Sequence, residues 1–142
     1  MNLVKVMVFG TFDGLHDGHR DFFQQALSYG EHLVVVVSRD AAIAHTYGEN
    51  PEYDEVDRIA AILGEGIAKD VVMGHLDGKE KVIVEHEPNT IVLGYSQKPL
   101  QSALYDKVRA LGLGEINIKI AKEFNSDDYP PSGFDKASVH VD

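Results

Sequence analysis

Apolar runs of strand length alternate with amphipathic helical segments along most of the chain. The run Leu-Val-Val-Val-Val at residues 33–37 is typical of a central parallel strand that is buried on both faces. Helical segments place apolar residues three and four apart, as Phe22 and Ala26 are. The strand-like segments are residues 4–9, 32–38, 69–73, 90–93 and 115–121, and the helical ones are residues 18–29, 53–63, 79–87 and 100–111.

This alternation predicts an α/β fold with a doubly wound, Rossmann-like parallel sheet of five strands. A chain of 142 residues is long enough for one domain with a full core. We expect that domain to span residues 1–122. Residues 123–142 lose the periodicity, so we expect a C-terminal loop that contributes to the site or covers it.

The loop after the first strand concentrates the polar chemistry of the chain. Residues 10–19 read Gly-Thr-Phe-Asp-Gly-Leu-His-Asp-Gly-His. Ligands of such sheets bind beyond the carboxyl ends of the strands. If a helix begins near Asp17, His16 and His19 can both face the space above its N-terminus, where the unpaired amides and the helix dipole favour an anion. The loop therefore predicts a phosphate site.

The residue types in this loop suit a phosphate that gains charge during a reaction. Two imidazoles that donate to phosphate oxygens bind more strongly as negative charge develops. Gly10 and Gly14 would let the backbone approach the phosphate closely. The chain has neither a Walker loop nor a Gly-x-Gly-x-x-Gly dinucleotide motif.

The motif Gly-Thr-Phe-Asp-x-x-His-x-Gly-His over residues 10–19 resembles the signature of the cytidylyltransferase-type nucleotidylyltransferase superfamily. Val-Val-Val-Ser-Arg-Asp at 35–40 and Leu-Gly-Tyr-Ser-Gln at 93–97 are most similar to archaeal-type FAD synthetases. The resemblance implies transfer of a nucleoside monophosphate from ATP or CTP to a phosphorylated acceptor, with Mg²⁺ and release of pyrophosphate. FMN is the expected acceptor, and glycerol-3-phosphate, sugar phosphates and phosphopantetheine remain open.

The resemblance also implies roles for individual residues. His16 and His19 would hold the triphosphate and stabilise the pentavalent phosphorus. Arg58 would reach the triphosphate or the acceptor phosphate, and Asp13 would orient the loop or help to seat Mg²⁺. The expected nucleotide-binding residues are Gly10, Thr11, Phe12, Asp13, Gly18, Gly94, Tyr95, Gln97 and Ser132, of which Gly94, Tyr95 and Gln97 would border the adenine pocket.

Two departures from the family pattern favour an alternative function. The family usually has a lysine after the second strand, where residues 41–45 offer only His45. The C-terminal Ile-Ser-Thr-Thr-x-x-Lys motif is replaced at residues 129–136, where only Ser132 and Lys136 could serve. The alternative is a nucleotide-binding protein with weak or lost catalysis.

Each proposed site residue also has a structural interpretation. His16 and His19 could merely cap a helix, or bind zinc with Asp13, although this set of ligands is incomplete and we expect no protein-held metal. Asp13 could accept N–H groups of its own loop. Arg58 could be a solvated helix residue paired with Asp54 or Glu55.

Composition excludes several classes of protein. The absence of cysteine rules out disulfides, thiolate metal sites and cysteine nucleophiles, and the net charge of −10 argues against non-specific nucleic-acid binding. No apolar run is long enough to cross a membrane, and we expect no targeting segment. These features predict a cytoplasmic protein. The exposed edge of an open sheet would also permit a homodimer, as in relatives.

Overall fold

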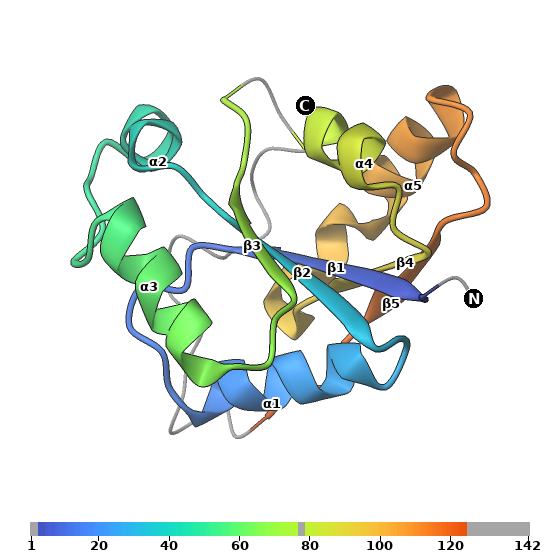
Figure 1. Cartoon of the computed structure of the whole chain (residues 1–142). Coiled ribbons are helices and arrows are strands. Elements are labelled where there is room, and N and C mark those ends of the chain that lie inside the picture. Colours follow the sequence, from blue (N-terminus) through green and yellow to red (C-terminus); the bar gives the residue numbers. More distant parts are fainter. Residues whose placement is uncertain (1–2, 77–78, 125–142) are drawn as a thin grey trace.

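A five-stranded parallel sheet forms the centre of the computed structural model, which describes residues 3–76 and 79–124 (Figure 1). The strand order is β3-β2-β1-β4-β5. The predicted Rossmann-like α/β fold is therefore confirmed. The strands are β1 (Lys5–Gly10), β2 (His32–Val37), β3 (Asp70–Met73), β4 (Thr90–Leu93) and β5 (Asn117–Ile120).

Helices cover both faces of this sheet (Figure 1). Helices α1 (Asp17–Leu27) and α3 (Glu55–Glu65) pack on one face, where Phe23 and Ile62 join a fully buried layer. Helices α4 (Glu80–His86) and α5 (Gln101–Ala110) pack on the other. The apolar run in β2 has no polar face because both of its sides are buried.

Two short elements depart from the predicted pattern. Helix α2 (Asp40–Tyr47) forms where residues 41–45 were expected to be a loop, so two helices connect β2 to β3. Only Ile43 of α2 is buried, and the helix therefore has no amphipathic pattern to reveal it. Its alanines favour helix, and Gly48 ends it at a φ of 70°. The 3₁₀-helix η1 (Tyr95–Leu100) precedes α5.

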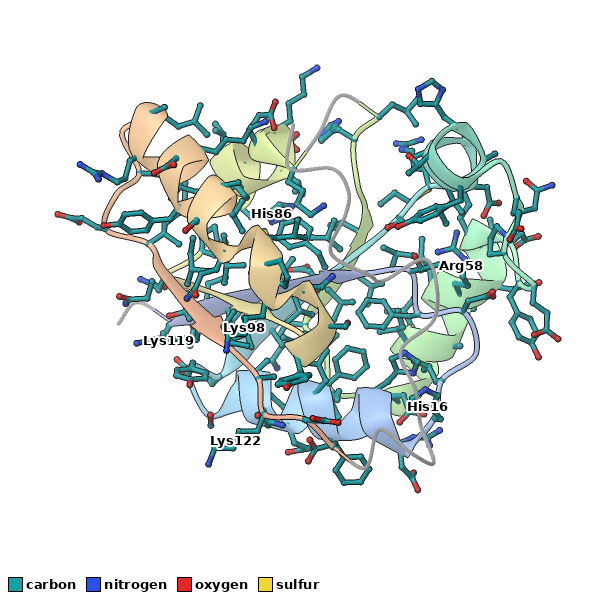
Figure 2. All side chains as sticks on the ribbon, turned by 180° about the vertical axis from the view of Figure 1, so that it is seen from behind. His16, Arg58, His86, Lys98, Lys119 and Lys122 are labelled. Carbon is teal, nitrogen blue, oxygen red and sulfur yellow. The ribbon has the colours of Figure 1, made fainter. Side chains whose placement is uncertain are left out.

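The position of the site follows from the strand order. The chain builds the sheet outward from β1 through β2 to β3, and then returns to the other side of β1 with β4. The order thus reverses between β1 and β4, where open sheets bind ligands beyond the carboxyl ends of their strands. Figure 2 shows His16 and Arg58 toward the end of the molecule at which β1 terminates.

Candidate active site

His16 and His19 cap the N-terminus of α1 reciprocally. The Nδ1 atom of His16 accepts the N–H of Gly18 at 3.0 Å, and the Nδ1 atom of His19 accepts the N–H of His16 at 3.3 Å. This is a capping box in which two imidazoles replace the usual hydroxyl and carboxylate. The helix begins at Asp17, as the sequence predicts. Both rings are therefore fixed above the amides of the first helical turn.

The caps determine which ring nitrogen carries the proton. An Nδ1 atom that accepts an N–H bond is unprotonated, so the proton of the neutral ring is on Nε2. Burial, with smaller contributions from the charges of His16 and Arg20, lowers the pKa of His19 to about 4. At neutral pH, His19 is therefore an uncharged Nε2–H donor. In each ring Nδ1 caps the helix, and Nε2 carries the N–H that would donate to a phosphate. A capping role and a catalytic role for the two histidines are therefore compatible.

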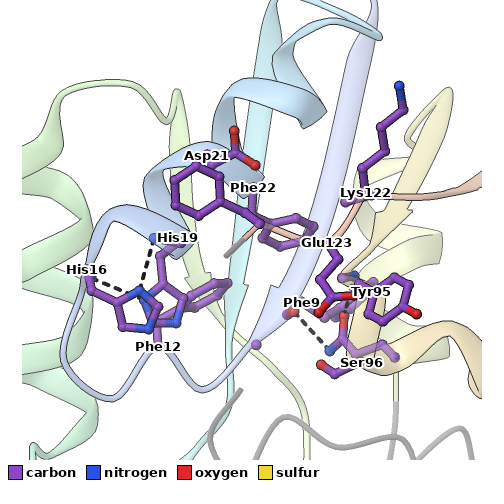
Figure 3. A pocket seen from close by; sticks show the side chains of 16 residues that line it. Phe9, Phe12, His16, His19, Asp21, Phe22, Tyr95, Ser96, Lys122 and Glu123 are labelled. Carbon is purple, nitrogen blue, oxygen red and sulfur yellow. Dashed lines mark hydrogen bonds between the residues drawn. The ribbon is translucent and has the colours of Figure 1, made fainter. Parts of the chain in front are cut away.

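A pocket of about 130 Å³ opens beside these rings, between the carboxyl ends of β1 and β4 (Figure 3). It draws residues from the loops that follow both strands. The predicted site residues that line it are Gly10, Phe12, His16, Gly18, His19, Gly94, Tyr95 and Gln97. The structure thus brings together two sequence segments that were assigned to the site separately.

The pocket also contains residues that sequence reasoning missed. Phe22 lines it from α1 and Lys122 lines it from the segment that follows β5, while Phe124 belongs to the segment that was expected to contribute to the site. The position of Lys122 in the sequence could have revealed it, because residues 121–124 directly follow a strand of the same parallel sheet. Phe22, Tyr95 and Phe124 make much of the lining aromatic.

Gln97 braces the two walls of the pocket. Its Oε1 atom accepts the N–H of Gly94 at 2.9 Å, and its Nε2 atom donates to the carbonyl of Phe9 at 3.2 Å. The side chain is buried and joins the end of β4 to the end of β1. Gln97 therefore helps to fix the width of the pocket.

Phe12 explains the glycine at position 10. A Cβ atom on Gly10 would lie 2.7 Å from Cζ of the Phe12 ring, so that ring occupies the space that glycine leaves. This differs from the expected close approach of a phosphate. Phe12 has a φ of 54°, and its ring meets His19 edge-on with centroids 5.5 Å apart. The conformation of the loop is thus coupled to the orientation of a catalytic candidate.

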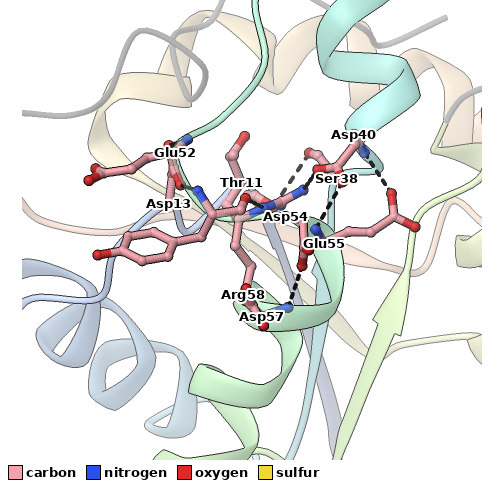
Figure 4. A network of polar contacts seen from close by, with 11 residues as sticks. Thr11, Asp13, Ser38, Asp40, Glu52, Asp54, Glu55, Asp57 and Arg58 are labelled. Atoms are coloured by element: carbon pink, nitrogen blue, oxygen red, sulfur yellow. Dashed lines mark hydrogen bonds and ion pairs between the residues drawn. The ribbon is translucent and has the colours of Figure 1, made fainter.

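Arg58 lies in a buried polar network behind the loop (Figure 4). Its guanidinium donates to the carbonyl of Thr11 at 2.8 Å, the carbonyl of Tyr53 at 3.0 Å and Oδ1 of Asp40 at 2.7 Å. The side chain has no exposed surface. The alternative of a solvated arginine paired with Asp54 or Glu55 is therefore wrong. Neither Arg58 nor Thr11 is among the residues that line the pocket.

Asp13 connects the phosphate loop to the segment before α3. Its two carboxylate oxygens accept the N–H groups of Glu52 at 2.8 Å and Tyr53 at 2.9 Å. The expected bonds within its own loop are replaced by bonds to a segment about forty residues away. Asp13 orients the loop from outside the pocket, consistent with the first of its two expected roles.

A second cavity, of about 590 Å³, lies at the carboxyl ends of β1 and β2. Basic side chains gather in its lining, which includes Arg39, His45, His75 and Lys79. Phe9 lines this cavity as well as the first pocket. Two cavities thus meet at the end of β1.

Arg39 has a structural role. Its Nε atom donates to the carbonyl of Gly74 at 2.6 Å, which joins the loops that follow β2 and β3. Ser132 and Lys136 lie outside the described residues. Within residues 3–76 and 79–124, no three His, Cys, Asp or Glu side chains cluster as a metal site. No helix in this part of the chain is long and apolar enough to cross a membrane.

The fold and the paired histidines define a nucleotidylyltransferase. The chain belongs to the cytidylyltransferase-like family, whose model matches residues 7–129. It is 35% identical over 120 residues to the FAD synthase of Thermoplasma volcanium, a match that covers 84% of each chain. The FAD synthase of Thermoplasma acidophilum is 34% identical over the same share of each chain. The predicted superfamily membership is confirmed.

Solved structures share the fold. A crystal structure described as the lipopolysaccharide core biosynthesis protein from Thermoplasma volcanium superposes with a TM-score of 0.81 and 33% identity, covering 87% of this chain and all of that one. Pantothenate synthetase from Thermus thermophilus gives a TM-score of 0.65 at 13% identity, covering 93% of this chain and 60% of that one. The second comparison supports the fold alone.

Proposed function

We propose that the protein transfers the AMP group of ATP to the phosphate of FMN, forming FAD and pyrophosphate. The observation that carries the proposal is the pair of capping histidines, His16 and His19, at a helix N-terminus beside the pocket. The FAD synthases at 34–35% identity support FMN as the acceptor.

The chemistry requires little from the protein beyond position and charge. An oxygen of the FMN phosphate attacks the α-phosphorus of ATP, and the bond from that phosphorus to the bridging oxygen of the β-phosphate breaks. The attacking oxygen is already anionic, so alignment of the two phosphates and stabilisation of developing charge supply the rate. The Nε2–H groups of His16 and His19 are the donors for that charge, because the amides of Gly18, His19 and Arg20 are already bonded to His16.

The two cavities support separate binding sites for the two substrates. The pocket beside His16 takes the nucleotide, because aromatic rings such as Phe22 and Tyr95 provide surfaces for a purine. The larger cavity, of about 590 Å³, takes the FMN, because basic side chains such as Lys79 in its lining suit a phosphate. Both substrates would then present their phosphates near Phe9, where the cavities meet.

Mg²⁺ enters with the nucleotide in this proposal. Both oxygens of Asp13 accept backbone N–H groups, and no cluster of three ligating side chains occurs in the described residues. The chain therefore fits an ion that is held mainly by triphosphate oxygens. When bound, that ion would neutralise charge on the phosphates. His16 and His19 would bind and orient the triphosphate on the protein side.

The test is pyrophosphate release by the purified full-length protein. ATP and CTP are each combined with FMN, glycerol-3-phosphate, a sugar phosphate and phosphopantetheine. The proposal predicts release with ATP and FMN, and FAD as the flavin product. Release with another pair but not with ATP and FMN would overturn the flavin assignment. Calorimetric binding of ATP without release from any pair would favour the nucleotide-binding alternative.

A further inference from the structure

We propose that Lys79 binds the phosphate of the acceptor and holds it against the α-phosphate of the nucleotide. This inference rests on the proposed function, because it assigns a specific residue to the second substrate. Lys79 lies immediately before α4, on the side of the sheet opposite α1. Nothing in the sequence motif points to it.

The position of Lys79 follows from its contact with Phe9. The Nζ atom lies 5.5 Å from the centroid of the Phe9 ring, within reach of a cation–π interaction. Phe9 is buried and lines both cavities, while Lys79 lines the larger one. The ammonium group is therefore held at the boundary between the proposed nucleotide pocket and the proposed acceptor cavity.

A cation is needed at this boundary. The attacking phosphate and the α-phosphate are both anions, and they must approach to about 3–3.5 Å for the reaction. Their repulsion is least screened in a recess that excludes water, and the protein itself carries a net charge of −10. A cation between the two phosphates lowers this repulsion and keeps the attacking oxygen in place.

Arg39 and His75, two other basic residues that line the cavity, have partners within the protein. The Nε atom of Arg39 donates to the carbonyl of Gly74 at 2.6 Å. The Nε2 atom of His75 lies 2.6 Å from Oε1 of Glu85. Lys79 brings its Nζ atom to Phe9, the residue that borders both cavities. It also supplies a lysine to the cavity that His45 lines from α2.

The experiment compares FMN with riboflavin, which lacks the phosphate, by quenching of flavin fluorescence. The variants are Lys79→Met and Lys79→Arg, with Lys81→Met as the control on an exposed position of the same helix. We expect the wild type to bind FMN more tightly than riboflavin. Lys79→Met should reduce this preference by roughly tenfold or more, the scale of one charged hydrogen bond. Lys79→Arg should retain most of it, and Lys81→Met all of it.

Steady-state kinetics give a second readout. Lys79→Met should raise the KM for FMN and lower kcat, while the affinity for ATP measured by calorimetry stays unchanged. An unchanged ratio of FMN to riboflavin affinity in Lys79→Met would overturn the assignment of Lys79 while leaving the proposed function intact. A wild type that neither binds FMN nor releases pyrophosphate with it would overturn both.

Discussion

The imidazole rings of His16 and His19 stack with their centroids 4.0 Å apart and their planes inclined by 28°. Each ring uses Nδ1 to accept a backbone N–H at the start of α1. One pair of residues thus stabilises the helix start and supplies the donors that a nucleotidyl transfer requires. Substitutions can separate these two roles.

Asparagine and glutamine distinguish the two nitrogens of His19. Asparagine places an acceptor oxygen near the position of Nδ1, whereas glutamine places an amide donor near the position of Nε2. We expect His19→Asn to keep the cap and to lower kcat by at least about a hundredfold, the scale of losing one transition-state donor. His19→Gln should retain more activity and also keep the cap, because glutamine is a usual residue at the third helical position of a capping box. Pyrophosphate release and urea unfolding measure the two effects.

The same substitutions at His16 form a matched series, because its Nδ1 caps Gly18. Wild-type rates in both asparagine variants would remove Nε2 from the mechanism. Equal stability of His16→Gln and the wild type would show that the cap at the first of these positions contributes nothing.

The lowered pKa of His19 predicts a pH-dependent stability. Between its ordinary pKa of 6.5 and its folded value of about 4, the unfolded chain binds a proton that the folded chain excludes. The free energy of unfolding should therefore fall as the pH drops from 6.5 to 4, by at most about 3 kcal/mol from this residue. Melting temperatures across this range measure the effect. His19→Asn should show a shallower pH dependence, and identical slopes would refute the assignment.

Arg58 should matter for stability more than its position beside the loop suggests. Replacing it with methionine leaves the carbonyls of Thr11 and Tyr53 without this donor, while Asp40 keeps the N–H of Glu55. A buried acceptor left unsatisfied costs about 1–3 kcal/mol. We expect Arg58→Met to lose stability on this scale in urea unfolding, and Arg58→Lys to lose part of it. A loss below about 1 kcal/mol in Arg58→Met would contradict the network.

Two glycines should respond in opposite directions to alanine. At Gly10 the new methyl group would meet the Phe12 ring, and overpacking of this kind costs roughly 1–3 kcal/mol. At Gly64, within α3, a Cβ atom meets nothing within 4 Å, so alanine should stabilise the helix by about 0.5–1 kcal/mol. Unfolding free energies of the two variants test this contrast. A Gly10→Ala protein as stable as the wild type would show that the ring does not require the glycine.

The sequence contained enough information for the fold and for half of the site. A strand that is buried on both faces, such as residues 33–37, is apolar throughout, so the sequence alone reveals it. The start of α1 at Asp17 depends on local capping residues, which the sequence also shows. The order of strands then determines that the loops after β1 and β4 meet. Gly94 and His16, which line the same pocket, could therefore be assigned to one site from the sequence.

Long-range contacts account for what could not be predicted. Asp13 binds backbone groups about forty residues away, and the guanidinium of Arg58 is buried by the loop that it supports. The spacing of residues near Asp13 or Arg58 in the sequence does not indicate these distant partners. Lys79 precedes a helix of seven residues in an otherwise ordinary segment. Its relation to Phe9 depends on how two layers of the fold pack together. The predicted homodimer stays a prediction.

Transfer of an isotopic label tests the central claim most directly. The wild-type protein is incubated with FMN and ATP labelled either at the α-phosphorus or at the γ-phosphorus, and the flavin product is separated. The account predicts α-label in FAD and γ-label in pyrophosphate, with both products strongly reduced in His16→Asn. Flavin that acquires no α-label, or that acquires γ-label instead, would contradict nucleotidyl transfer to FMN by this site.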